Sequence, residues 1–290
     1  MTPAGFALVF AAALCHAGWN FLMKRIGGGL ELIWLFSALS AVLYLPLAIW
    51  VVAGAAEGFT PQQWLAIAGS TTLHLTYFVA LQQGYRNGDL SLVYPTARAT
   101  GPLLTALVAV WWFGNPISAQ AVAGIALIVG GVLMLSGVFT RRTHASPAAA
   151  PTRSIVFGLG IGVLIAAYSL WDSHAVAVLM IAPLLLDYVP SLVRSVLLGP
   201  IAWQRRQLVA AHWNSNKWPV IGVAVFAPLA YILVLYALTF TPVIYVAPTR
   251  ELSVLFTVLL GTIVLKEAEP GRRLFFAGVM VVGVILLATG

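Results

Sequence analysis

Residues 94–98 read Tyr-Pro-Thr-Ala-Arg and residues 247–251 read Ala-Pro-Thr-Arg-Glu, and both stretches lie inside long apolar segments. Each stretch places a proline where a membrane helix can break, and an arginine follows two or three residues later. A charge within a segment that crosses the hydrocarbon core is costly, so it marks a functional site by default. We therefore expect Arg98, Arg250 and Glu251 to face one another across a substrate site.

The composition around these two stretches is that of a membrane protein. Of the 290 residues, 61% are hydrophobic and only 8% are charged, whereas a soluble domain carries about 25% charged residues. Because one membrane-spanning helix needs roughly 20 residues, the length allows about ten spans joined by short loops. We expect a multi-pass protein of the cell (inner) membrane, with the lipid bilayer as its surroundings.

Apolar runs place the membrane spans approximately at residues 4–23, 30–53, 63–83, 90–112, 119–139, 155–175, 183–203, 218–238, 243–264 and 272–290. We predict helices, because a helix satisfies its own backbone hydrogen bonds in lipid. A transmembrane barrel would instead show stretches of about ten residues with alternating polarity. The expected fold class is an all-α membrane protein with ten transmembrane helices in two inverted five-helix repeats.

Weak internal similarity divides the chain into a first repeat at residues 1–140, a polar linker at 141–154 and a second repeat at 155–290. With a shift of 154 residues, Tyr77 aligns with Tyr231 and Gly124 with Gly278. Ordered matches at a nearly constant shift indicate an internal repeat. An odd number of spans per unit gives the two units opposite orientations. Many secondary transporters follow this plan, with the substrate site near the midplane between the repeats.

The distribution of basic residues predicts the orientation in the membrane. Three of the 15 Lys and Arg residues, Arg98, Arg194 and Arg250, fall within predicted spans. The other twelve lie in loops on the side away from the termini, so the positive-inside rule places both termini outside the cytoplasm. The net charge of +7 is scattered over short loops. It therefore does not indicate a nucleic-acid partner.

Three further spans carry pairs of polar residues about one helical turn apart. These candidate substrate ligands are His16 and Asn20 in the first span, His74 and Tyr77 in the third, and Tyr168 and Asp172 in the sixth. Each pair either contacts the substrate or forms hydrogen bonds between helices. No third ligand is spaced to join His16 and His74, so we expect neither a metal site nor another cofactor.

The prolines and threonines of the two central stretches are also candidate site residues. Pro95 and Pro248 each remove a backbone donor and free a carbonyl group. Such breaks are tolerated where a membrane helix lines protein or water, so both prolines are candidate cavity markers. Thr96 and Thr249 offer hydroxyl groups either to a ligand or back to their own helices.

The charges within the spans leave several roles open. Arg194 follows Asp187 by seven residues and either lines the cavity or forms a structural ion pair. Glu251 either pairs with Arg98 or Arg194, or carries a coupling proton. With Asp172 and Asp187 near predicted span ends, three arginines face one carboxylate at mid-depth. A resting counter-ion, a water-filled cavity or an anionic substrate would compensate this excess of buried positive charge.

The sequence resembles a known transporter family at several places. Residues 259–267 read Leu-Leu-Gly-Thr-Ile-Val-Leu-Lys-Glu, and the glycine-containing run at 278–287 follows them. Both resemble the end of an EamA repeat of the drug/metabolite transporter superfamily, and residues 16–20 resemble the start of that family's first helix. The family commonly has Gly-Glu where this chain has Lys266-Glu267, and the first half departs further with Gly114-Asn115.

The resemblance implies a ten-helix transporter with a central cavity. Relatives export amino acids and other metabolites, move nucleotide sugars, exchange phosphorylated sugars or translocate lipid-linked sugars. In the phosphate-exchanging relatives, basic residues on the fourth and ninth helices hold the anion. Arg98 and Arg250 fall on those helices here.

We therefore predict a secondary transporter that moves a small polar, anionic metabolite across the cytoplasmic membrane by alternating access. An amino-acid or drug-like metabolite exporter, a lipid-linked sugar flippase and a non-transporting membrane receptor remain alternatives. We expect no enzyme, because the sequence has no motif that joins a nucleophile to a base. It has no nucleotide-binding loop of the Gly-x-x-x-x-Gly-Lys type either. Substrate identity, transport direction, coupling to a proton or a counter-substrate, and a monomeric or homodimeric state stay open.

Overall fold

A computed structural model describes residues 1–55, 58–87, 90–112, 114, 117–135, 151–263 and 270–290. The regular elements in these ranges are all helices. They are α1 (Pro3–Ile26), α2 (Leu30–Gly54), α3 (Pro61–Asn87), α4 (Leu90–Trp111), α5 (Ala119–Leu135), α6 (Pro151–Ala177), α7 (Pro183–Gln204), α8 (Arg206–Leu238), α9 (Val243–Thr249), α10 (Leu252–Ile263) and α11 (Pro270–Thr289).

Each of the ten predicted spans overlaps a helical segment. The structure differs from the prediction in the ninth span, at the start of α8 and in the linker. The ninth predicted span consists of two helices, because α9 ends at Thr249 and α10 begins at Leu252. Helix α8 begins at Arg206, well before the predicted residue 218, and bends at Asn216, where φ is −135°. Residues 151–154 of the predicted linker belong to α6, and residues 141–150 lie outside the described ranges.

Six of the helices in the described ranges are long and apolar enough to cross a membrane: α1, α2, α3, α6, α7 and α8. Helices α5 and α11 are apolar but contribute shorter qualifying segments. Strongly apolar helices of this length satisfy their backbone hydrogen bonds internally, as the hydrocarbon core requires. The chain is therefore an all-helical, multi-pass membrane protein.

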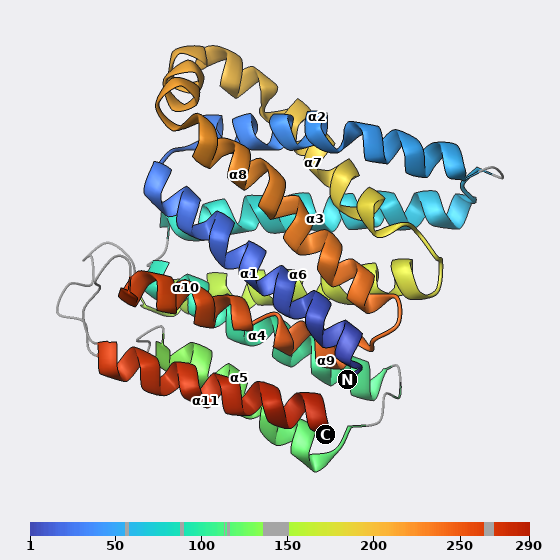
Figure 1. Cartoon of the computed structure of the whole chain (residues 1–290), viewed down its shortest axis with the longest axis vertical. Coiled ribbons are helices and arrows are strands. Elements are labelled where there is room, and N and C mark those ends of the chain that lie inside the picture. The colour runs from blue at the N-terminus through green and yellow to red at the C-terminus, as the bar shows by residue number, and fades with distance from the viewer. Residues whose placement is uncertain (56–57, 88–89, 113, 115–116, 136–150, 264–269) are drawn as a thin grey trace.

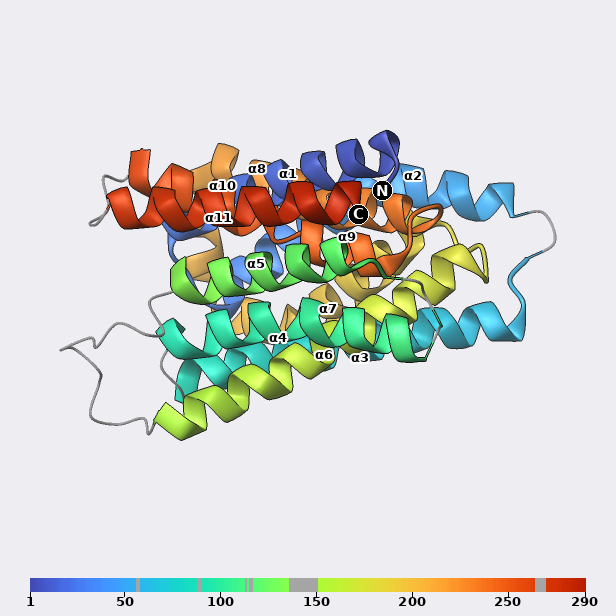
Figure 2. The same cartoon turned by 90° about the horizontal axis from the view of Figure 1, so that it is seen from below.

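The helices form a bundle in which segments from the two halves of the chain lie side by side. Helix α4 packs extensively against α6, α1 against α8, α2 against α7, and α5 against α11. Figures 1 and 2 show α1, α8, α10 and α11 on one side of the bundle, α3, α4 and α6 on the other, and the short α9 between them. The middle of the bundle therefore lies where residues from both halves meet.

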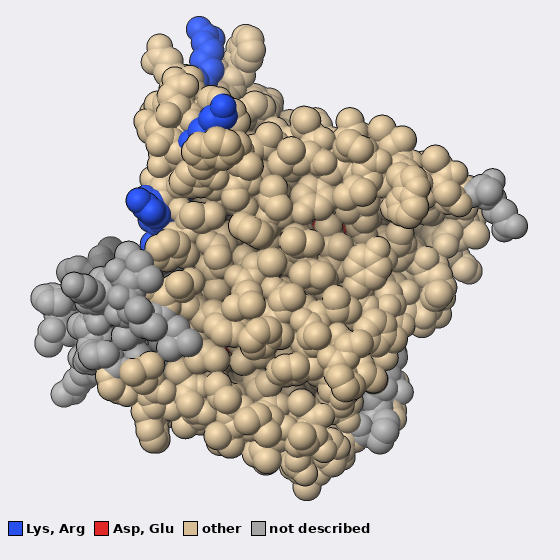
Figure 3. Space-filling model, viewed as in Figure 1, with Lys and Arg blue, Asp and Glu red and all other residues tan. Residues whose placement is uncertain are grey.

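Both termini lie at one end of the bundle (Figure 1), and the amino group of Met1 donates a hydrogen bond of 3.1 Å to the carbonyl of Ala288. The described loop cations lie at the opposite end: Lys24 and Arg25 close α1, Arg86 closes α3, Arg153 begins α6, Arg205 and Arg206 join α7 to α8, and Arg272 begins α11. In Figure 3 the visible Lys and Arg side chains gather at one edge of the molecule. Charge is thus segregated along the bundle axis.

Helices α5 and α11 approach so closely that glycine is required at the contact. A Cβ atom added at Gly124 would lie 2.7 Å from the carbonyl oxygen of Gly283, and one added at Gly283 would lie 2.8 Å from the carbonyl oxygen of Gly124. Small residues let membrane helices pack backbone against backbone. Gly124, Gly131 and Gly283 therefore serve this contact, whereas nothing lies within 4 Å of a Cβ atom added at Gly130 or Gly278.

We expect Gly124→Ala to destabilise the protein by about 1–3 kcal/mol, because the opposing atoms are backbone and cannot rotate away. Gly278→Ala on α11 is a matched control, since nothing lies within 4 Å of its added methyl group. That control is expected to be neutral or slightly stabilising, because alanine favours helices over glycine by about 1 kcal/mol. Thermal unfolding of both variants in detergent compares them directly. Equal effects would contradict the close approach of α5 and α11.

Candidate functional site

The candidate site is organised around the break between α9 and α10. Pro248 is the last residue but one of α9 and has no N–H to donate. The N–H of Glu251 donates to the carbonyl of Pro248 at 3.0 Å, and the N–H of Val254 donates to the carbonyl of Glu251 at 2.9 Å. These hydrogen bonds span three residues instead of four. Arg250 and Glu251 thus occupy a tight turn between two buried helices.

The corresponding stretch of the first half is not broken. Helix α4 runs without interruption from Leu90 to Trp111 and contains Pro95, Thr96 and Arg98. The expectation of a break at both prolines is therefore met only at Pro248. The two halves present their arginines from different local structures, one from a continuous helix and one from a turn.

Arg98 and Glu251 form an ion pair between the two halves of the chain. The Nε atom of Arg98 lies 3.1 Å from Oε2 of Glu251, and Nη2 of Arg98 donates a hydrogen bond of 2.8 Å to the hydroxyl of Ser253. The two side chains are only 12% and 4% exposed. Of the two partners considered for Glu251, the structure places Arg98 beside it.

Arg250 lies next to this ion pair but has a different environment. Its guanidinium carbon is 5.4 Å from the centre of the Tyr231 ring, a cation–π distance. In the described part of the chain no carboxylate oxygen lies within 4.0 Å of an Arg250 nitrogen. The charges of Arg98 and Glu251 both act on Arg250, and both arginines act on His16 of α1. Among the described residues, Arg250 is therefore a half-buried cation without a carboxylate at ion-pair distance.

A second group of polar side chains, the Asp172 cluster, adjoins Arg250. It consists of His74 and Tyr77 of α3, Tyr168 and Asp172 of α6, and Tyr231 of α8. Nε2 of His74 lies 2.9 Å from Oδ2 of Asp172, and the hydroxyl of Tyr231 donates a hydrogen bond to the same oxygen.

Aromatic rings enclose this carboxylate. The ring of Tyr168 has its centre 4.4 Å from that of His74 and 5.5 Å from that of Tyr77. Asp172 is fully buried. Its Oδ1 atom has no hydrogen-bond partner among the described residues. Tyr231 connects the two groups, since its hydroxyl contacts Asp172 while its ring faces Arg250.

The position of Asp172 changes the charge balance expected from the sequence. Asp172 was placed near a span end, but α6 continues to Ala177 and packs Asp172 against the middle of α3, where His74 meets it. The site therefore contains two arginines, Arg98 and Arg250, and two carboxylates, Asp172 and Glu251. The expected excess of three cations over one anion is not present.

Several other predicted ligands serve helix packing in this structure. Thr96 lies against Gly158 of α6. Thr249 is fully buried and donates its hydroxyl to the carbonyl of Tyr245 in its own helix at 2.7 Å. The side-chain amide of Asn20 donates to the carbonyl of His16 at 2.7 Å. The Thr249 contact is the bond to its own helix stated as one alternative, whereas Asn20 bonds within α1 and not between helices.

Arg194 lies apart from the two groups. Its Nε donates to the hydroxyl of Ser37 at 3.0 Å and its Nη2 to Ser191 at 3.3 Å, while its guanidinium faces the ring of Phe78. These contacts join α7 to α2 and α3. Asp187 acts on Arg194 electrostatically but is not within ion-pair distance in the described chain.

Three features of the structure were not predicted. Tyr231 was not predicted as a ligand. Its alignment with the candidate ligand Tyr77 in the internal repeat could have identified it. Ser253 has no signature in the sequence. Glu31, at the start of α2, pairs with Arg205 at 2.9 Å and joins the α1–α2 and α7–α8 connections. Such a pair between distant loops depends on tertiary packing alone.

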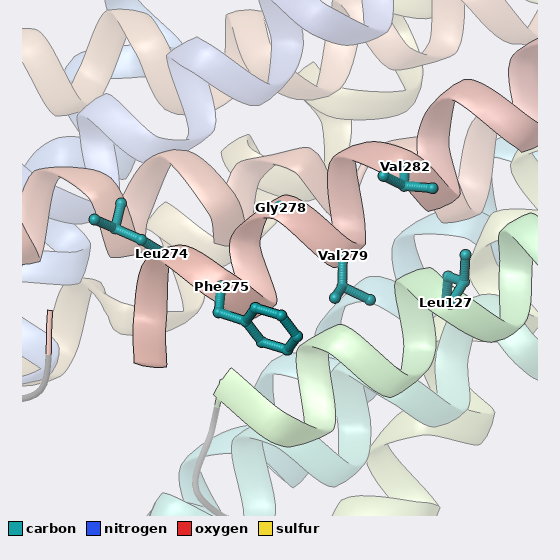
Figure 4. A pocket seen from close by; sticks show the side chains of 6 residues that line it. All are labelled: Leu127, Leu274, Phe275, Gly278, Val279 and Val282. Atoms are coloured by element: carbon teal, nitrogen blue, oxygen red, sulfur yellow. The ribbon is translucent and has the colours of Figure 1, made fainter. Parts of the chain in front are cut away.

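Two mainly apolar grooves in the described structure lie away from Arg250 and the Asp172 cluster, and the second also includes Thr152 and Arg153. One groove of about 470 Å³ between α5 and α11 is lined by Leu127, Leu274, Phe275, Gly278, Val279 and Val282 (Figure 4). Another, of about 680 Å³, runs along α6 and includes Val156, Gly160 and Leu164. Surfaces of this composition suit lipid chains, so neither groove is a candidate site for a polar substrate.

Comparison with solved structures supports the fold. One crystal structure superposes with a TM-score of 0.70, covering 100% of this chain and 98% of the other at 15% sequence identity. At that identity the likeness establishes the fold and not the function.

Sequence relatives are named multidrug resistance proteins. The multidrug resistance protein EbrB of Bacillus subtilis (strain 168) is 40% identical over 80 residues, which are 28% of this chain and 67% of the relative. EbrB of Bacillus atrophaeus is 36% identical over 104 residues, 34% of this chain and 87% of the relative. EbrA of Bacillus atrophaeus is 31% identical over 80 residues, 28% of this chain and 74% of the relative.

The EamA-like transporter family matches both halves of the chain, at residues 3–137 and 152–289. Together these segments include nearly all of the helical bundle and every residue of the candidate site. The chain belongs to the EamA-like transporter family.

Proposed function

We propose that this protein is a secondary transporter that moves a small polar metabolite with an anionic group by alternating access. The observation that carries the proposal is Arg250. It is a half-buried arginine with no carboxylate within ion-pair distance in the described chain, placed beside an ion pair that joins the two halves. An unpaired buried charge is strongly unfavourable, so a bound anion would compensate it.

The proposal includes two inverted repeats, and the packing of the helices supports it. If each helix is replaced by its counterpart in the other half, the α1–α8 contact becomes the α6–α3 contact. In the same way the α4–α6 contact becomes the α10–α1 contact, and all four contacts occur. The α2–α7 and α5–α11 contacts each join a helix to its own counterpart in the other half, so the exchange leaves them unchanged. The relatives also fit, because 80 residues make up 67% of the first, which is therefore about as long as one half of this chain.

Alternating access requires contacts that can open between the repeats. The Arg98–Glu251 pair is such a contact, because Arg98 lies on α4 and Glu251 precedes α10. An anion that binds Arg250 would also attract Arg98 and compete with Glu251. Arginine suits this exchange, since its planar guanidinium can hold a carboxylate, phosphate or phosphonate with two hydrogen bonds.

Export of drug-like cations is a second candidate, and one specific observation favours it. The relatives are named multidrug resistance proteins, and the Asp172 cluster surrounds a buried carboxylate with aromatic rings. Aromatic faces and a carboxylate together attract organic cations. In this case Asp172, and not Arg250, would contact the substrate.

A ligand screen separates the two candidates. The purified protein would be heated with carboxylates, phosphates, phosphonates, amino acids and quaternary ammonium compounds. A ligand at 100 times its dissociation constant stabilises the protein by about 2.7 kcal/mol, which thermal unfolding detects. Stabilisation by anions, lost in Arg250→Gln, supports the anion transporter. Stabilisation only by organic cations would rule out the anion transporter and would favour the exporter of drug-like cations.

The orientation is likewise a proposal, with the basic end of the bundle in the cytoplasm and both termini outside. A reporter that is active only in the cytoplasm is expected to be inactive when fused to Gly290. The same reporter inserted within residues 141–150 is the matched control and is expected to be active. The reverse pattern of activity would overturn the orientation but would leave the helical bundle unchanged.

A further inference from the structure

We propose that the His74–Asp172 pair is the proton-binding site that couples transport, in place of Glu251. This inference rests on the proposed alternating-access transporter, and its coupling step rests on an anionic substrate. The structure supplies the geometry: a fully buried carboxylate in contact with one imidazole and one phenol, beside the unpaired Arg250.

Glu251 is poorly placed to exchange a proton. Arg98 holds it at 3.1 Å, and the positive charge of Arg250 acts on it as well. Protonation of Glu251 would also leave Arg98 buried without its partner. The carboxylate of Glu251 is thus already engaged in the ion pair with Arg98.

Asp172 has a different set of neighbours. In the described chain its polar contacts are His74 and Tyr231, and no guanidinium nitrogen lies within 4.0 Å. Its Oδ1 atom is buried without a hydrogen-bond donor. A buried carboxylate oxygen without a donor is an uncompensated acceptor, so a proton bound nearby stabilises the carboxylate.

The pair can bind and release one proton without losing its hydrogen bond. In the protonated form, the imidazolium of His74 donates Nε2–H to Asp172, and the pair is neutral overall. When Nδ1 releases its proton to water, the neutral ring still donates Nε2–H, and the pair carries one negative charge. The side chain of His74 is 18% exposed whereas that of Asp172 is 0% exposed, so His74 is the route for the proton.

Titratable and charged groups surround the pair on every helix that packs against it. They are Tyr77 of α3, Arg98 of α4, Tyr168 of α6, Asp187 of α7, Tyr231 of α8 and Arg250 of the turn between α9 and α10. Asp187 is the other carboxylate in this set and acts on Asp172. The two arginines lie on the side of the substrate site proposed above.

Tyr231 links the state of the pair to that site. Its hydroxyl contacts Asp172 and its ring faces Arg250, so a negative charge on the pair attracts Arg250 and weakens its hold on an anion. A proton on the pair has the opposite effect. By linkage, the proton and an anionic substrate then strengthen each other's binding, as proton-coupled symport requires.

The test uses the ligand-free protein in lipid bilayers, with the proton as the only probe. Protein labelled with ¹⁵N at histidine and arginine would be studied by solid-state NMR between pH 5 and 9. We expect the non-protonated Nδ1 signal of His74, identified by its loss in His74→Gln, to disappear as the pH falls. The arginine signal of Arg250, identified in Arg250→Lys, is expected to shift at the same midpoint.

Asp172→Asn is expected to abolish the titration of His74 in this range, whereas Glu251→Gln is expected to leave it in place. Thermal unfolding would confirm that both variants are folded. A His74 signal that does not titrate in the wild-type protein, or that titrates equally in Asp172→Asn, would overturn the proposal. The proposal would also be overturned if the titration of His74 were lost in Glu251→Gln but kept in Asp172→Asn. Because no substrate is added, these outcomes are independent of the ligand screen.

Discussion

Replacing Arg98 by glutamine is expected to destabilise the protein by about 3–5 kcal/mol, the cost of leaving one member of a buried ion pair without its partner. Glu251 is 3% exposed and would remain beside Ser253 without a cation at ion-pair distance. Glu251→Gln is expected to destabilise the protein in the same way, because it leaves Arg98 uncompensated. Thermal unfolding in detergent would measure both effects.

A double-mutant cycle separates the ion pair from other contacts of the two residues. The Arg98→Gln, Glu251→Gln double variant is expected to be more stable than the sum of the single effects predicts, because it leaves no isolated charge. Arg86→Gln at the end of α3 is the matched control, since Arg86 is exposed. Additive effects, or a control as unstable as Arg98→Gln, would show that the pair does not join the halves.

Replacing Arg250 by glutamine is expected to weaken binding of an anionic ligand by about 30-fold to several thousand-fold, which corresponds to 2–5 kcal/mol for truncating a buried charged partner. Its effect on the stability of the ligand-free protein is expected to be much smaller than that of Arg98→Gln. The reason is that Arg250 has no carboxylate at ion-pair distance to leave behind in the described chain. Arg250→Lys is expected to bind with intermediate affinity, because lysine keeps the charge but not the planar fork.

The measurement is the shift in unfolding temperature at increasing concentrations of an anion identified in the screen. Arg194→Gln is the matched control, because Arg194 is also a half-buried arginine but contacts Ser37 and Ser191 outside the site. Its ligand affinity is expected to remain within a few-fold of the wild type. Unchanged affinity in Arg250→Gln, or equal loss in Arg194→Gln, would contradict an anion site at Arg250.

Much of the fold could be predicted from the sequence because lipid imposes strong local constraints. A run of about 20 apolar residues must form a helix to satisfy its backbone, whatever its neighbours are. The apolar helices and their approximate bounds were predictable for this reason. The membership in the EamA-like transporter family was predictable from the resemblance at residues 16–20, 259–267 and 278–287. The segregation of loop cations was predictable as well, because each loop's side follows from the count of spans.

The sequence identified several residues of the candidate site, but it did not predict which of them contact one another. Arg98, Arg250 and Glu251 stand out because a charge in an apolar segment is rare. Their partners depend on how helices distant in the sequence meet. Glu251 had two possible arginine partners in the sequence, and Asp172 seemed to lie near a helix end.

The sequence by itself therefore determined the apolar helices, the division into two halves and the presence of buried charges, since composition and length decide these in lipid. Only the tertiary structure decided that Arg98 pairs with Glu251, that Tyr231 connects Asp172 with Arg250, and that Arg194 lies apart. The physical reason is that an ion pair or hydrogen bond forms over about 3 Å. Rotating or sliding one helix by a single residue is enough to exchange one partner for another.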